Sequence, residues 1–208
     1  MRTLSDAKRQ AIMDSAAEAF AELGFERTSM SEICKRVGGS KTTLYNYFPS
    51  KEVLFFEVMF QATEGKFEAI HASLDPECRN VEDVLLEFGQ RFLAFIYSPE
   101  VLPVRRLAIA ESGRSDLGRL CFEKGQSRNQ ALLTNYLRVS IDQGKLRQTD
   151  ANMAALHLSG LLLAEHNDLT MLCVQDSVSE EEIRTGTQRA IEVFMRAYGP
   201  DQATAITQ

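Results

Sequence analysis

The chain has 208 residues, of which 44% are hydrophobic and 25% are charged, and its formal net charge at pH 7 is −6. This composition is typical of one or two folded domains with a sizeable core. No segment approaches the roughly 20 consecutive apolar residues of a membrane-spanning helix, and residues 1–5 lack the apolar stretch of a secretory signal. We therefore expect a cytoplasmic protein with no membrane partner.

The charge is distributed unevenly along the chain. Residues 67–208 contain 14 basic and 20 acidic residues, whereas residues 1–66 contain nine of each. Within residues 27–51 five basic residues accompany one acidic residue. Because salt screens charges beyond about 8 Å, this local positive patch is sufficient for contact with DNA phosphates, and the acidic remainder is expected to face away.

The four cysteines are Cys34, Cys78, Cys121 and Cys173, and they stand far apart in the sequence. None forms a C-x-x-C pair or has a histidine at metal-ligand spacing. The sequence therefore predicts buried free thiols, no metal site and no cofactor, with a redox sensor as the alternative.

Period-two runs of β-branched residues are absent, so the sequence predicts an all-α protein. The first helix is expected over residues 6–23, with Ser5 as N-cap and Gly24 ending it. A second helix starts at Ser29, where Ser29 and Glu32 fit a capping box. Gly38 and Gly39 are then expected to end this helix.

Ser40 is the expected N-cap of a third helix over residues 41–48, and a fourth helix should follow residue 50 and run to about residue 73. Two short helices joined by a glycine turn indicate a helix-turn-helix, which places one helix in the major groove of DNA. In the third helix Leu44 and Phe48 share the inner face. Thr42 and Asn46 point outward, with short polar side chains suited to base edges.

Longer helices are expected in the remainder of the chain. The predicted ranges are 81–97, 101–112, 115–142 with a possible break near Gly125, 150–173, and 179–198 with a capping box from Ser179 and Glu182, followed by a frayed tail at 201–208.

The N-terminal third resembles the helix-turn-helix domain of TetR-family transcriptional regulators. The matching residues are Ala16, Phe20, Gly24, Phe25, Ile33, Gly38, Ser40 and the run T-L-Y-N-Y-F-x-S-K-E-x-L over residues 43–54. The departures are Cys34, Val37, Gly39 and Thr42. Residues 102–111 and the helix from Asp150 are similar to the AefR-like subgroup.

The resemblance implies a DNA-binding domain over residues 6–66 and a helical C-terminal domain over residues 67–200 that binds an effector and dimerises. It implies a repressor that a small-molecule effector releases from double-stranded operator DNA. Lys41, Thr42, Tyr45 and Asn46 are expected at the major groove, and Ser31, Thr43, Tyr47 and Lys51 at the phosphates. The full predicted set is Ser29, Ser31, Ser40, Lys41, Thr42, Thr43, Tyr45, Asn46, Tyr47 and Lys51.

A homodimer is expected through the two C-terminal helices, because both carry broad apolar stripes. On the first these are Met153, Leu156, Leu158, Leu161, Leu162 and Leu172, and on the second Ile183, Ala190, Ile191, Phe194 and Met195. The alternative is that both stripes belong to the core of one chain.

An effector pocket is expected among the helices of residues 81–175. Its candidate lining is Phe88, Phe92, Phe95, Arg106, Ile109, Glu111, Phe122, His157, Leu161 and Glu165, with His166 as a further polar candidate. A mostly apolar lining favours an uncharged or amphipathic ligand. The alternative is that the phenylalanines form ordinary core.

An enzyme is the competing class. The chain has no G-x-S-x-G, P-loop, G-x-G-x-x-G or H-E-x-x-H motif, so the sequence predicts a protein that is not an enzyme. A DNA-binding protein without an effector is the other alternative, but it would not need so large a C-terminal domain.

Overall fold

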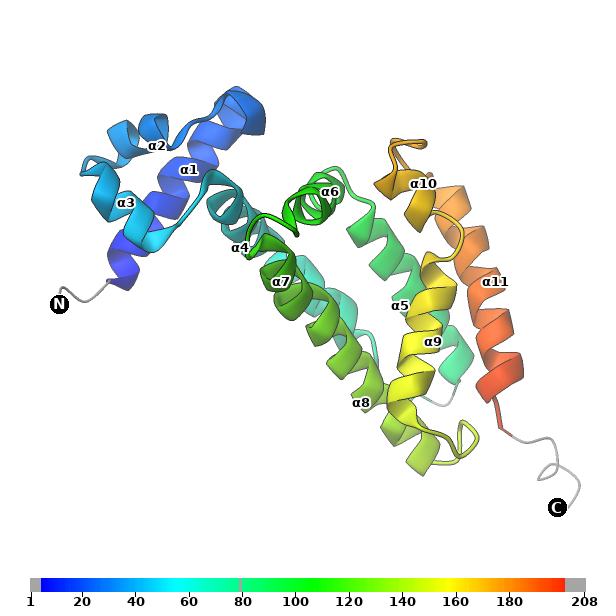
Figure 1. Cartoon of the computed structure of the whole chain (residues 1–208). Coiled ribbons are helices and arrows are strands. Elements are labelled where there is room, and N and C mark those ends of the chain that lie inside the picture. The colour runs from blue at the N-terminus through cyan, green and yellow to red at the C-terminus, as the bar shows by residue number, and fades with distance from the viewer. Residues whose placement is uncertain (1–4, 79, 201–208) are drawn as a thin grey trace, which may run out of the picture. The chain divides into compact units, whose positions relative to one another are not determined.

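The computed structural model describes residues 5–78 and 80–200, and every regular element within these ranges is a helix (Figure 1). The predicted all-α class is therefore confirmed. The tail predicted at 201–208 lies outside the described residues. The chain forms two compact units. The first extends to Glu64 and includes Leu107–Cys121, and the second comprises Gly65–Arg106 and the chain from Phe122 onward.

The domain boundary differs in detail from the one that the sequence predicts after residue 66. Contacts within the structure place it between Glu64 and Gly65, inside one continuous helix. They also assign Leu107–Cys121 to the first unit. This assignment could not be foreseen from the sequence, because the contacts join residues that are distant in the chain.

The first unit is built on α1 (Asp6–Arg27), α2 (Met30–Val37), α3 (Lys41–Tyr47) and the start of α4 (Lys51–Ala72). The Ser5 and Ser29 hydroxyls accept N–H bonds at the starts of α1 and α2, as predicted. Gly24 has a φ of +77° and interrupts α1, after which the chain completes one more turn. Only half of the capping box predicted at Ser29 forms, because the Glu32 carboxylate accepts from Arg36 instead.

The core of the first unit gathers apolar side chains from all these helices. Its members are Ile12, Met13, Ala16, Ala19, Phe20, Met30, Ile33, Cys34, Leu44, Phe48, Val53, Leu54 and Val58. Arg9 joins α1 to α4 beside this core, because its guanidinium donates to Glu57 at 2.9 Å and lies 5.1 Å from the ring centroid of Phe48. The second half of α6 (Leu102–Glu111), from Leu107 onward, and α7 (Leu117–Cys121) also belong to the first unit, and Leu120 packs against its core.

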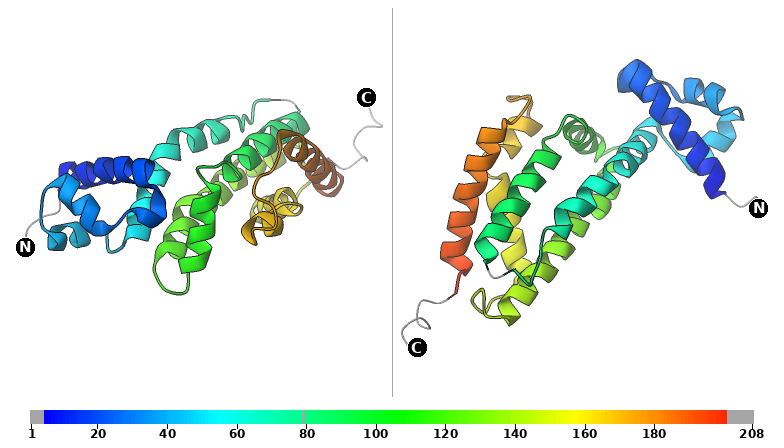
Figure 2. Two further views of the ribbon diagram at one scale, coloured as in Figure 1. Left: turned by 90° about the horizontal axis from the view of Figure 1, so that it is seen from above. Right: turned by 180° about the vertical axis from the view of Figure 1, so that it is seen from behind.

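The second unit contains α5 (Val81–Ile96), α8 (Arg128–Asp142), α9 (Ala151–Leu163), α10 (Asn167–Met171) and α11 (Glu180–Tyr198). Figure 2 shows α5, α9 and α11 side by side, and α8 packs against α9. Leu85, Phe88, Leu93, Leu137, Leu158 and Phe194 are almost fully buried in its core. The predicted capping box of Ser179 and Glu182 at the start of α11 is confirmed.

Two of the long helices predicted in this region are interrupted. The break expected near Gly125 is a π-helical turn, Phe122–Ser127, between α7 and α8. The prediction of a single helix over residues 150–173 is wrong, because this stretch divides into α9 and α10 around Ala164–His166. At this break Glu165 receives two bonds from Arg189 on α11, and His166 becomes buried. These tertiary contacts outweigh local helix propensity.

The prediction of buried thiols holds fully for Cys34 alone among the four. Cys78 and Cys121 are half-buried, and Cys173 is exposed. Cys173 also has a φ of +57°, because it lies in the turn that follows α10 rather than within a helix.

We expect Gly89→Ala to destabilise the protein. A Cβ atom at Gly89 would lie 2.7 Å from the Thr187 Cγ2 and 2.9 Å from a Leu162 methyl group. Overpacking costs about 1–3 kcal/mol, and two contacts under 3 Å place this site in the upper part of that range, above the roughly 1 kcal/mol of helix propensity gained.

Gly65→Ala is the matched control, because Gly65 is also inside a helix and a Cβ atom there meets nothing within 4 Å. Thermal unfolding followed by circular dichroism should show a lower Tm for Gly89→Ala and an unchanged or higher Tm for Gly65→Ala. Equal Tm values for the two variants would contradict the close approach of α5 and α11.

Candidate DNA-binding site

The turn between α2 and α3 is held by side chains from two helices. Gly38 has a φ of +66°, and its N–H donates to the Cys34 carbonyl at 3.2 Å. Lys8 Nζ donates to the Gly38 carbonyl at 3.2 Å, and the Cys34 thiol donates to the Gly39 carbonyl at 3.3 Å. The two carbonyl groups of the turn are therefore fixed from α1 and α2, and with them the direction in which α3 leaves.

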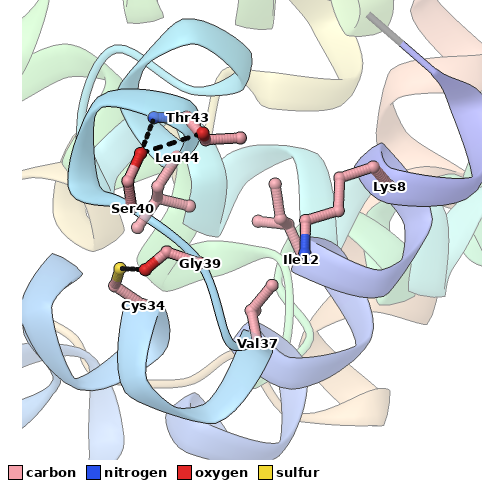
Figure 3. A pocket seen from close by; sticks show the side chains of 8 residues that line it. All are labelled: Lys8, Ile12, Cys34, Val37, Gly39, Ser40, Thr43 and Leu44. Atoms are coloured by element: carbon pink, nitrogen blue, oxygen red, sulfur yellow. Dashed lines mark hydrogen bonds between the residues drawn. The ribbon is translucent and has the colours of Figure 1, made fainter.

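A small cavity lies beneath this turn (Figure 3). Its lining consists of Lys8, Ile12, Cys34, Val37, Gly39, Ser40, Thr43 and Leu44. Its volume of about 10 Å³ is that of roughly one water molecule. The cavity is thus a packing defect behind α3 and is too small for an organic effector.

α3 is capped and anchored on one side only. The Ser40 hydroxyl accepts from the Thr43 N–H at 3.1 Å and lies 3.0 Å from the Thr43 hydroxyl. Leu44 and Phe48 are buried, 3% and 1% exposed respectively. The inner face predicted from helical periodicity therefore forms the contact of α3 with the core.

The opposite face of α3 is exposed and polar. Lys41, Thr42, Tyr45 and Asn46 are all exposed, and Thr43 is half-buried. Tyr45 keeps 48% of its surface exposed although it is aromatic. The residues predicted at the major groove thus form one continuous face of a helix whose other side is fixed. Ser31 is half-buried in the first turn of α2, and Ser29 is exposed at its N-cap.

Two predicted phosphate ligands have contacts within the protein. The Tyr47 hydroxyl accepts from the Ser5 N–H at 2.9 Å, which ties the end of α3 to the start of α1. Lys51 Nζ donates to the Phe25 carbonyl at 2.9 Å and lies 4.1 Å from the centroid of the Phe25 ring. The structure therefore directs the Lys51 ammonium toward the end of α1.

The positive patch is smaller than the sequence count suggests. Arg36 pairs with Glu22 at 2.8 Å and with Glu32 at 3.2 Å. The hydrogen bond from Arg36 lowers the pKa of Glu22, and the same bond raises the pKa of Arg36. Glu22 lies outside residues 27–51, so it does not enter the local charge count. Lys35 and Lys41 remain as exposed cations of α2 and α3.

Sequence reasoning does not identify Lys8 as part of this site. Lys8 is distant from the turn in the sequence, and an exposed lysine in an amphipathic helix gives no signal of a partner. The carbonyl group that it holds is visible only in the folded chain.

The residues predicted to line an effector pocket differ in their burial and in their surroundings within each unit. Phe88 is fully buried and stacks on Phe92, with ring centroids 5.6 Å apart. Phe95 is half-buried and meets the Phe67 ring edge-on, with ring centroids 6.3 Å apart. Ile109 and Phe122 are exposed, by 61% and 59%. Phe88 and Phe92 lie in the core cluster of the second unit.

The polar members of that predicted set have separate partners. Arg106 donates to the Thr170 and Gln175 carbonyls, and His157 is hydrogen-bonded to the Tyr198 hydroxyl. Glu165 accepts from Arg189, and Glu111 lies in the first unit beside Arg114 at 3.7 Å. Leu161 is half-buried against the core of the second unit.

The described residues contain neither a metal-binding cluster nor a membrane-spanning helix. Across 5–78 and 80–200, no group of three or more His, Cys, Asp or Glu side chains has an arrangement that could hold a metal ion. Every helix in these ranges is too short or too polar to cross a membrane.

Two short helices joined by a glycine turn, of which the second is buried on one face and exposes Lys, Thr, Tyr and Asn on the other, have the arrangement of a helix-turn-helix DNA-binding protein. The family comparisons make the assignment specific. The model for bacterial regulatory proteins of the tetR family matches residues 12–58. The model for the C-terminal domain of AefR-like transcriptional repressors matches residues 83–200. The chain therefore belongs to the TetR family of transcriptional regulators.

Solved structures agree with this assignment over nearly the whole chain. A structure assigned to the TetR family from Mesorhizobium loti MAFF303099 is 31% identical, with a TM-score of 0.78, and the match covers 95% of this chain and 100% of that one. The flavonoid-responsive regulator FrrA is 28% identical, with a TM-score of 0.69 and coverage of 95% and 100%.

Curated relatives match shorter segments. The transcriptional regulator UidR of Escherichia coli K12 is 41% identical over 101 residues, which is 45% of this chain and 51% of UidR. RutR of the same strain is 44% identical over 55 residues, which is 26% of each chain. The matched segment thus spans about half of UidR and a quarter of RutR. The protein is a DNA-binding transcriptional regulator, and the prediction of a protein that is not an enzyme is confirmed.

We expect Ser40→Ala to destabilise the protein by about 1 kcal/mol, because the Thr43 N–H loses its acceptor at the start of α3. Thr42→Ala, at an exposed position of the same helix, should change stability by less than about 0.5 kcal/mol. Thermal unfolding of both variants checks this. A Tm for Ser40→Ala equal to that of the wild type would show that the cap contributes nothing.

Proposed function

We propose that the protein is a repressor whose α3 enters the major groove of its operator and which a small-molecule effector releases from DNA. The observation that supports DNA reading is the single exposed face of Lys41, Thr42, Tyr45 and Asn46 opposite a buried Leu44. Thr and Asn side chains hydrogen-bond base edges, and an exposed Lys neutralises phosphates or reaches guanine. Such a regulator works where the chromosome is, in the cytoplasm.

The proposed phosphate contacts lie at the margins of this face. Ser31 and Thr43 carry hydroxyls beside the turn, and Tyr47 lies at the end of α3. Phosphate contacts of this kind set the register of a protein on DNA. Lys51 has a different position, since its ammonium is bonded to Phe25. We therefore propose that Lys51 fixes the start of α4 rather than neutralising a phosphate.

Effector control is supported by the way in which two helices are shared. α4 and α6 each contribute residues to both compact units. A ligand that prefers one arrangement of the second unit can therefore change the position of these helices and so the affinity for DNA. FrrA is described as responsive to flavonoids, and its similarity over 95% of this chain favours an aromatic effector.

A homodimer through α9 and α11 is supported by apolar side chains that the chain leaves uncovered. Met153 and Leu156 on α9 and Val193 on α11 are 45%, 46% and 48% exposed. The rest of the predicted stripes is largely internal. Leu158, Leu162, Ile183, Ala190, Ile191 and Phe194 lie in the core of the second unit. The dimer contact that we propose is therefore the outer face of α9 and α11.

Lys41 and Lys51 should affect DNA binding in different ways. Lys41→Met is expected to weaken binding and to reduce the slope of log affinity against log salt by about 1, the value expected when one phosphate is no longer neutralised. It should leave the Tm unchanged. Lys51→Met is expected to lower the Tm and keep the slope. Fluorescence anisotropy with operator DNA at several salt concentrations, together with thermal unfolding, measures both. The reverse pattern would show that Lys51 is the phosphate ligand.

Leu156→Glu should convert the dimer to a monomer at micromolar concentration, because it places a charge on the proposed apolar contact. Light scattering gives the mass directly. Gln188→Glu, at an exposed position of α11 that lies about 140° around the helix from Val193, is the control and should stay dimeric. A wild-type protein that is monomeric at the same concentration would exclude this interface.

A further inference from the structure

Tyr97 and His166 in the second unit carry buried polar atoms without hydrogen-bond partners, as do Tyr136, Ser159 and Thr187 in the described part of that unit. His166 is 9% exposed, and neither of its ring nitrogens has a partner. Tyr97 is 5% exposed, and its hydroxyl has none. Buried polar groups are nearly always paired, because leaving one unpaired costs stability. Two such groups in one place therefore point to a binding site rather than to ordinary packing.

The two side chains are neighbours in space. Their rings meet edge-to-face, with centroids 6.4 Å apart and planes at 85°. Tyr97 lies at the C-terminal end of α5, and His166 lies in the break between α9 and α10. On α11 Gly186 brings bare backbone next to the imidazole, since a Cβ atom there would lie 3.8 Å from His166 Nε2.

The nearest acidic group does not satisfy His166. Glu165 Oε2 lies 3.9 Å from His166 Nε2, which is too far for a hydrogen bond. The same carboxylate accepts from the Arg189 guanidinium at 2.7 and 2.5 Å, and this contact lowers the pKa of Glu165. Glu165 is thus committed to α11.

The segment that carries α10 is held by arginines of α6. Arg105 donates to Asn167 at 3.0 Å, and its guanidinium lies 5.8 Å from the Tyr97 ring centroid. Arg106 donates to the Thr170 carbonyl at 2.8 Å and to the Gln175 carbonyl at 3.2 Å. Just beyond α10, Leu172 and Val174 are exposed by 74% and 72%. Burial of Thr170, the packing of Met171 against the core and these polar contacts hold the segment beside His166.

We propose that Tyr97 and His166 form the hydrogen-bonding end of the effector site, under the α10 segment, and that they bind a neutral ligand through a hydroxyl or carbonyl group. This inference rests on the proposed function. It identifies the side chains that hydrogen-bond the effector and the ligand groups that they can bind.

The chemistry of the two groups selects the ligand class. A neutral imidazole has one donor and one acceptor, and a phenol can do both, so a ligand hydroxyl can donate to one group and accept from the other. Burial raises the pKa of Tyr97. The charge of Asp168 raises it further, and the charge of Arg105 lowers it. Tyr97 therefore keeps its proton at neutral pH. Glu165 and Asp168 disfavour an anion near the site, and Arg105 disfavours a cation.

The first test needs no ligand. Tyr97→Phe and His166→Phe are expected to keep or raise the Tm, because each removes a buried polar group that has no partner. His71→Phe is the matched control. His71 is equally buried, but its Nδ1 lies 2.8 Å from the Phe67 carbonyl and its Nε2 lies 2.9 Å from Asn129 Oδ1, so this variant should lose several degrees. Decreases in Tm for Tyr97→Phe and His166→Phe that equal the decrease for His71→Phe would overturn the proposal.

The second test uses flavone and 7-hydroxyflavone as probes, which differ by one hydroxyl group. The wild type should release operator DNA at a concentration of 7-hydroxyflavone about tenfold below that of flavone, the ratio expected for one hydrogen bond. In the Tyr97→Phe, His166→Phe double variant the two compounds should act at similar concentrations, with operator affinity in their absence unchanged.

The outcomes separate this inference from the proposed function. A wild type that does not bind its operator contradicts the proposed function itself. A double variant that still prefers 7-hydroxyflavone tenfold shows that other residues read the hydroxyl, and it overturns this inference alone. A wild type that binds its operator but ignores both compounds overturns the assigned ligand class.

Discussion

Burial of Leu44 and Phe48 in the core of the first unit decides what this protein presents to DNA. A helix as short as α3 is not stable alone in water, so it exists because these two side chains and the Ser40 cap hold it. Because that face is fixed in the core, helical periodicity places the side chains of Thr42, Tyr45 and Asn46 on the solvent-exposed face. Arg9, which pairs with Glu57 and lies over Phe48, supports the same anchor from α1 and α4.

The parts of this site that the sequence predicts are those governed by short-range rules. Caps at Ser5, Ser29 and Ser40, the interruptions of the helices at Gly24 and Gly38, and the inner and outer faces of α3 all follow from residues within one or two helical turns of each other. The parts that it does not predict depend on contacts between distant segments. Arg36 pairs with Glu22, Lys51 bonds to Phe25, and Lys8 holds the turn. A count of local charge cannot anticipate these pairings.

The second unit shows the same division more strongly. Apolar periodicity locates α5, α8 and α11, but it cannot distinguish core phenylalanines from pocket-lining ones, since both have the same sequence pattern. The break between α9 and α10 depends on Glu165 meeting Arg189 and on His166 becoming buried. His71 and His166 look alike in the sequence, yet one has both ring nitrogens bonded and the other has neither. Only the folded chain reveals which histidine is structural.

The π-helical turn at Phe122–Ser127 joins α7, which belongs to the first unit, to α8, which belongs to the second. α7 places Leu117 in the first unit, and α8 places Leu133 and Leu137 in the core of the second. A π turn contains one residue more than an α turn, so it shifts the angular phase of every later side chain by about 100°. Deleting one residue there would leave the backbone helical but would turn Leu133 and Leu137 of α8 by about 100° relative to α7. The number of residues in this turn is therefore constrained, whereas its side chains, none of which is buried, can be substituted.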